Sequence, residues 1–171
     1  RDLVMSEVIH YLTFAGAPTS GALQVETAVI AGTITTAGNA NVTVTAAGMS
    51  NSPKVVVVAL ALNDTASQAA TKIRAALAAD ADVASFFTVS GSGTDVVLTT
   101  LVTAANDATM NIAYADDTSV GLTDDATSNN TTAGALGTYR GARPGTLLAD
   151  TTNGRLYQNT GTRAVVTWTA L

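Results

Sequence analysis

Apolar and polar residues alternate along the first third of the chain with the period of two that β-strands require. Residues 24–29 read Gln-Val-Glu-Thr-Ala-Val, and residues 42–45 read Val-Thr-Val-Thr. This alternation predicts strands in both places. Residues 37–40, Ala-Gly-Asn-Ala, lie between two β-rich runs and predict a hairpin turn.

The segment from Val55 to Leu62 has a different pattern, because it is apolar at every position and begins with four valines. A continuous apolar run of this length is typical of a strand that is covered on both faces. It is far shorter than the roughly 20 residues that span a bilayer. We therefore predict a strand in the protein interior.

A helix is predicted at about residues 65–79, where the hydrophobic period changes. Thr65 followed by Gln68 matches a capping box, with Asp64 as the alternative cap. No Gly or Pro interrupts the segment that follows. Helical spacing places a set of small and apolar residues on one face: Ala69, Ala70, Ile73, Ala76 and Leu77. This face would let the helix lie close against a sheet.

Strand patterns return after Asp80-Ala81-Asp82, where we expect the helix to end. They cover residues 86–89, 95–102 and 110–114. The order β-β-β-α-β-β-β defines a central domain, residues 23–133. Strands on both sides of one helix favour an α+β, β-rich fold, with the helix packed on a mostly antiparallel sheet.

The two ends of the chain form separate predicted segments. Residues 134–171 start with a Gly-rich linker and continue as a C-terminal β-meander, with Asn153-Gly154 as the hairpin signal. Such a small meander needs support from another structure. Residues 1–22 are predicted to be an N-terminal arm. Its apolar residues fit a helix face or, at Leu12 and Phe14, a strand, and it either docks on a partner or packs on its own domain.

Composition and charge exclude several classes of protein. Only 12% of the 171 residues are charged and the net charge is −5, so the chain has no basic face for nucleic acid. No apolar run is long enough for a membrane span. Because there is no Cys, disulfides, thiolate nucleophiles and Cys-ligated zinc are excluded.

Catalytic patterns are missing from the sequence as well. His10 is the single imidazole, and no phosphate-binding loop or nucleophile elbow occurs. The acidic pairs Asp116-Asp117 and Asp124-Asp125 offer oxygen ligands for Ca²⁺, but they lack the spacing of a calcium loop, which favours solvated loops. We therefore predict no catalytic, cofactor-binding or metal-ligating residue and no cofactor, so that the chain is not an enzyme.

Three aromatic residues near the C-terminus have two interpretations. Tyr139, Tyr157 and Trp168 could form a platform on which a sugar stacks. Alternatively, Tyr157 and Trp168 pack the meander, since both lie in alternating segments. The alternation favours packing.

Two parts of the chain resemble proteins of tailed bacteriophages. The similarity to a module of tailed-phage virion proteins covers residues 46–53, 63–77, 87–93, 97–99 and 105–112. A second resemblance, to the C-terminal motif of phage head-fibre and capsid decoration proteins, covers residues 144–147, 150–157, 159–162 and 167–168. Together they imply a virion surface protein.

The resemblance implies a non-enzymatic structural protein, a cement or decoration protein that stabilises the capsid exterior as a homotrimer. Its partners would be the major capsid protein and its own copies, without nucleic acid or membrane. The arm is the expected capsid contact through Leu3, Met5, Val8, Ile9, Leu12 and Phe14. The alternative is a tail-fibre or baseplate module that binds a glycan of the host surface.

Overall fold

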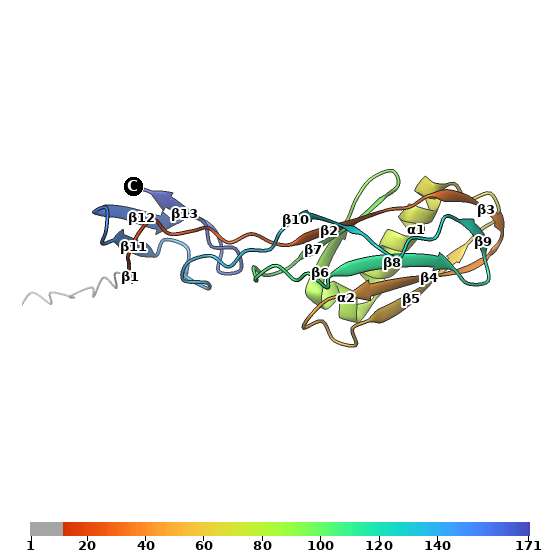
Figure 1. Ribbon diagram of the computed structural model, residues 1–171, viewed down its shortest axis with the longest axis horizontal. Coiled ribbons are helices and arrows are strands. Elements are labelled where there is room, and N and C mark those ends of the chain that lie inside the picture. The colour runs from red at the N-terminus through yellow and green to blue at the C-terminus, as the bar shows by residue number, and fades with distance from the viewer. Residues whose placement is uncertain (1–11) are drawn as a thin grey trace, which may run out of the picture. The chain divides into compact units, whose positions relative to one another are not determined.

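The computed structural model describes residues 12–171, which form two compact units (Figure 1). One unit is Ala22–Ala135. The other joins residues 12–21 to Leu136–Leu171. The residues of the predicted central domain, 23–133, lie within the larger unit. Residues 12–21, taken in the sequence as part of an N-terminal arm, lie in the same unit as the C-terminal meander.

The larger unit is built from antiparallel strand pairs. Its sheets have the strand orders β10-β2-β7-β6, β5-β4-β8 and β3-β9. The bounds are β2 Val25–Val29, β3 Gly32–Thr36, β4 Gly38–Thr45, β5 Lys54–Leu60, β6 Phe87–Ser90, β7 Asp95–Thr100, β8 Asn111–Asp116, β9 Val120–Leu122 and β10 Asn129–Thr132. With two helices added, this confirms the predicted α+β, β-rich class.

Strand β4 is the centre of the three-stranded sheet, with β5 on one side and β8 on the other. Its inward residues Ala40, Val42 and Val44 are fully buried, as the alternation requires. The predicted hairpin turn at residues 37–40 is wrong, because β4 begins at Gly38 and β3 pairs with β9. A side chain at Gly38 would meet the backbone of the loop after β8 at 2.4 Å. The backbone of that loop therefore leaves no room for a side chain at position 38.

Strand β5 is covered on one face only. Val56, Val58 and Leu60 point into the core, whereas Val55 and Val57 are 51% and 57% exposed. The prediction of cover on both faces is therefore wrong. The reason is that only the inner face of the β5-β4-β8 sheet meets the core, so the alternate residues of β5 face outward and stay exposed.

Helix α1 (Ala66–Ala79) covers the core and has the predicted cap. The Thr65 hydroxyl accepts a hydrogen bond from the Gln68 N–H, and the Gln68 side chain accepts one from the Thr65 N–H at 2.9 Å. The predicted apolar face is confirmed, since Ile73 and Leu77 are fully buried, together with Ala69 and Ala70. The helix contacts β5 of one sheet and β6 and β7 of another (Figure 1).

A second helix, α2 (Ala81–Phe86), follows where a loop and the start of a strand were expected. Asp80 ends α1 and also caps α2, because its Oδ1 accepts hydrogen bonds from the N–H groups of Asp82 and Val83 at 3.0 and 3.1 Å. One aspartate therefore redirects the chain between two helices. The sequence showed only the end of the first helix.

The inward face of β2 is unexpectedly polar. Gln24, Glu26 and Ala28 point inward and are buried, whereas Val29 is exposed. Gln24 is satisfied by Asp107: its side-chain amide donates to the Asp107 carbonyl at 2.8 Å and accepts from the Asp107 N–H at 2.7 Å. The alternation predicted the strand correctly, but the face with two valines turns outward.

The smaller unit is a four-stranded sheet with the order β1-β11-β12-β13. Strand β1 (Leu12–Phe14) runs parallel to β11 (Leu147–Asp150), which confirms the strand alternative for these residues. Strands β12 (Arg155–Asn159) and β13 (Trp168–Ala170) follow antiparallel, and the predicted hairpin at Asn153-Gly154 is confirmed. The fully or nearly buried apolar core of this unit consists of Leu148, Val166 and Trp168.

Two buried polar residues hold the loops of this small sheet. Asp150 accepts hydrogen bonds from the N–H groups of Gly16, Thr152 and Asn153 at 2.9–3.1 Å. The amide of Asn159 is bonded on both sides, with its oxygen accepting from Gly161 and Thr167 at 3.0 Å. Because the apolar core is so small, these contacts do much to fix the chain path.

Replacing Leu77 by Ala tests the packing of α1. The residue is fully buried, so Leu77→Ala should lower the free energy of unfolding by about 2–5 kcal/mol in urea titrations. The matched control is Leu62→Ala at an exposed position, which should cost less than about 0.5 kcal/mol. Equal losses in the two variants would contradict the assigned face.

Acid should weaken the larger unit through Asp64. Burial opposes ionisation of Asp64, but hydrogen bonds from the Lys72 ammonium and the Ala61 N–H outweigh it and hold the pKa below the ordinary 3.8. This stabilisation is complete above the unfolded-state pKa and is lost as the pH falls from about 4 through the lower folded-state pKa.

Asp64→Asn should therefore make stability less dependent on pH in this range. Urea titrations at about pH 6, 4 and 3 would show a smaller acid-induced loss than in the unmodified protein. An unchanged loss would mean that the ion pair with Lys72 does not stabilise the fold.

Candidate functional site

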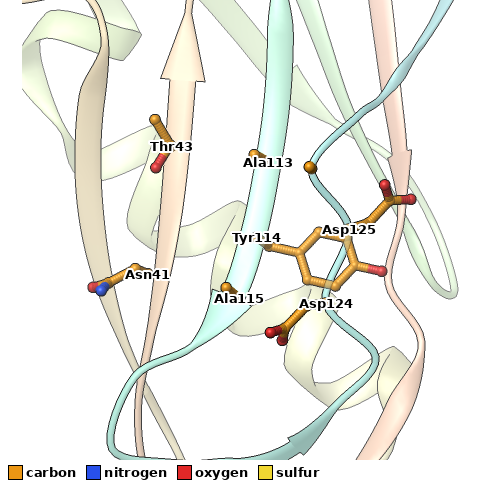
Figure 2. Close-up of a pocket in the computed structure, with 8 residues that line it drawn as sticks. Asn41, Thr43, Ala113, Tyr114, Ala115, Asp124 and Asp125 are labelled. Carbon is orange, nitrogen blue, oxygen red and sulfur yellow. The ribbon is translucent and has the colours of Figure 1, made fainter.

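The outer face of the β5-β4-β8 sheet is the candidate binding surface, which we call the valine face. Two rows of residues cross its three strands in register. One row is Val55, Thr43 and Ala113, and the other is Val57, Asn41 and Ala115. Figure 2 shows the part of this face formed by β4 and β8. The side chains in both rows are short and uncharged, so the face is flat and neutral.

A shallow hollow of about 300 Å³ lies where the valine face meets the segment 124–126. This segment runs beside β8, because Tyr114 and Asp125 exchange backbone hydrogen bonds of 2.8 and 3.0 Å. In Figure 2 the Tyr114 ring lies beside Asp124 and Asp125. Small side chains of β4 and β8 therefore meet a carboxylate rim.

Tyr114 is a structural residue in this hollow. Its side chain is buried and its hydroxyl donates to the Val29 carbonyl at 2.8 Å. Burial raises the pKa of this hydroxyl above its ordinary 10.0, and the neighbouring Asp125 and Asp124 act in the same direction. Tyr114 thus stays neutral and connects β8 to β2.

The acidic pairs serve the local backbone. The Asp116 carboxylate accepts hydrogen bonds from the N–H groups of Gly121 and Leu122 at 2.7 and 3.1 Å. Asp124 accepts one from the Asp116 N–H at 2.9 Å. Carboxylates used in this way shape the loop after β8. Among residues 12–171, no three or more His, Asp or Glu side chains are grouped so that they could hold a metal ion.

Only two of the six predicted capsid-contact residues lie in the described part of the chain. Leu3, Met5, Val8 and Ile9 lie outside the described residues, as does His10. Leu12 is half-buried and packs against the small core of its own unit. Phe14 is exposed, and its ring meets the Tyr139 ring edge-on with the centroids 6.2 Å apart. The structure thus leaves Phe14 available for a partner and uses Leu12 internally.

The aromatic residues do not form one platform. Trp168 is 8% exposed, lies in the core of the smaller unit and donates its indole N–H to the Thr138 carbonyl at 2.8 Å. Tyr157 packs partly against the same core. Tyr139 is exposed and contacts Phe14 instead of the other two aromatic residues. Packing, which the alternation favoured, is the role that the structure gives Trp168 and Tyr157.

The valine face itself was missed at the level of sequence. Its signal was present, because Val55 and Val57 occupy alternate positions of one strand. With valine on both faces of the strand, however, the pattern could not show that one face stays open. In this structure the arrangement offers an uncharged sheet face with exposed valines on the edge strand β5, which suits protein binding.

Comparisons with known proteins add no relative. No family model, curated protein or solved structure matches this chain. Within the described residues, no helix is long and apolar enough to cross a membrane.

Proposed function

We propose that this chain is a non-enzymatic structural protein of a tailed-phage virion, where it decorates and stabilises the outer surface of the capsid as a homotrimer. The observation that carries the proposal is the valine face, an uncharged surface on which Val55 and Val57 of the edge strand β5 are exposed. The sequence resemblance supplies the virion setting. The major capsid protein and other copies of the chain are the partners.

The valine face would form the contact between copies. Exposed strand edges usually carry lysine, proline or a bulge that prevents pairing with another chain. Strand β5 has a lysine only at its first position, Lys54. Its outward residues after Lys54 are Val55, Val57 and Ala59. Covering such a face removes apolar area from water, at roughly 25 cal/mol per Å². Both rows of the valine face are neutral, so contact between the rows of two copies brings no like charges together.

The smaller unit would form the contact with the capsid. With three of its described residues in the buried core, it gains much from any partner that binds its folded form. Phe14, Tyr139 and Leu156 are exposed on it. Residues 1–11 lead directly into β1 and add four of the predicted contact residues. Binding energy at this unit would hold neighbouring capsomers together.

The first prediction of this proposal concerns assembly. The unmodified chain should sediment as a trimer, and Val57→Lys should weaken trimer formation at least 10-fold by placing a charge in the contact. The matched control is Val120→Lys, because Val120 is equally exposed but lies on β9. A monomeric unmodified protein would contradict the trimer, and a trimeric Val57→Lys protein would contradict this contact.

The second prediction concerns capsid binding. Cryo-electron microscopy of particles that carry the chain should show density on the capsid exterior at local three-fold positions. Deleting residues 1–11 should leave a folded trimer that no longer binds capsids. The deletion stops before Leu12 because β1 belongs to the sheet of the smaller unit.

Two results would overturn the capsid assignment. Density on the tail would replace it with a receptor-binding role. Full binding by the shortened chain would mean that residues 1–11 are not part of the contact. The exposed rings of Phe14 and Tyr139 would then be the next residues to substitute.

A further inference from the structure

A second, polar pocket of about 480 Å³ lies elsewhere in the larger unit. The loop 106–111 and the segment 127–130 line it, together with Glu26 of β2. The lining side chains are mostly amides, hydroxyls and carboxyls, including Asn111 and Ser128. Its chemistry therefore differs from that of the valine face.

Glu26 is the unusual member of this pocket. Its side chain is only 2% exposed, although it belongs to the lining. One carboxyl oxygen, Oε1, accepts a hydrogen bond from the Ser128 hydroxyl at 2.7 Å. The other, Oε2, is buried and has no hydrogen-bond partner among the described residues. A buried oxygen in this state is costly, and it requires a donor or a cation.

The hydrogen bonds around Glu26 leave its Oε2 without a donor among the described residues. The Ser128 hydroxyl lies 2.7 Å from Glu26 Oε1 and 3.1 Å from Asn111 Oδ1, and it already accepts from the Ile112 N–H at 2.9 Å. That proton serves Glu26 Oε1, since Asn111 Oδ1 already accepts a hydrogen bond from the Ser128 N–H at 2.8 Å. Glu26 Oε2 is therefore the acceptor that remains without a donor among the described residues, and a bound cation would balance it.

The charges in the pocket are also unbalanced. Asp107 is a second carboxylate in the lining, and none of the lining residues is Lys or Arg. The ion pairs of the described residues join Lys54 and Lys72 to other aspartates. Burial raises the pKa of Glu26 above the ordinary 4.5, and the negative charge of Asp107 adds to this, against the hydrogen bond from Ser128.

We propose that this pocket is a binding site for a hard divalent cation, Ca²⁺, held by oxygens of Glu26, Asn111 and Ser128 with Asp107 as a second negative charge. Carboxylate, amide and hydroxyl oxygens are ligand types that Ca²⁺ accepts, in flexible geometry and with water in the remaining positions. Two carboxylates match the charge of one divalent ion. The inference goes beyond the proposed function and does not depend on it.

The test is calorimetric titration of the full chain after treatment with a chelator, using CaCl₂, MgCl₂ and methylammonium chloride. We expect one Ca²⁺ per chain, with weaker binding of Mg²⁺, which requires stricter octahedral geometry. A Ca²⁺ concentration about 100-fold above Kd should raise Tm by roughly 5 °C or more.

Variants locate the ion. Glu26→Gln keeps the size of the side chain and should abolish both the heat of binding and the rise in Tm. Asp117→Asn removes an exposed carboxylate outside the pocket and should leave both unchanged. If Glu26→Gln does not fold, Ser128→Ala takes its place and should weaken Ca²⁺ binding at least 10-fold.

Three results would overturn the proposal. The absence of Ca²⁺ binding at millimolar concentration would assign a proton to Glu26 instead. A response to methylammonium equal to that to Ca²⁺ would point to an ammonium group as the ligand. Equal losses in Glu26→Gln and Asp117→Asn would mean that Ca²⁺ binds only to the general negative charge of the protein.

Discussion

Backbone N–H groups at the ends of many short strands must find acceptors, and the fold depends on short polar side chains that provide them. Asp80 caps one helix while ending another, Asp116 closes the loop after β8, and Asp150 binds the turn between β11 and β12. The amide of Asn159 binds the backbone on both sides: its oxygen accepts from the Gly161 N–H, and its nitrogen donates to the Ala142 carbonyl. This requirement explains a chain with many Asp and Asn but few long charged side chains.

The same requirement separates structural from functional polar groups. An aspartate whose oxygens already accept backbone hydrogen bonds has little capacity left for chemistry, which is the position of Asp116 and Asp150. Glu26 departs from this pattern, because one of its oxygens is buried without a partner. Glu26 therefore has an oxygen free for a ligand, whereas the Asp116 carboxylate of the acidic loop, a calcium candidate in the sequence, already binds the backbone.

The two units differ in how they are stabilised. The larger one has a core of more than twenty buried residues between its sheets and α1, and it can leave a face of one sheet open. In the part of the smaller unit that the structure describes, three residues form the core, and Asp150, Asn159 and the pairing of β1 with β11 add stability. The open face in one unit and the small core in the other both leave surface that burial against a partner would stabilise.

The sequence alone determined the elements whose signals are local: the helix with its Thr65–Gln68 cap and buried Ile73, the alternating strand at 42–45, and the hairpin at Asn153-Gly154. These depend on neighbours within a few positions, so spacing is enough to predict them. Only the tertiary structure decided which face of β2 turns inward, which face of β5 stays open, and that β3 pairs with β9. It also decided that Leu12–Phe14 joins the C-terminal sheet, and that Glu26 lies beneath residues about 80 to 100 positions further along. The partners that fix these features are distant in sequence, and a strand pattern with a period of two does not say which partner each face will meet.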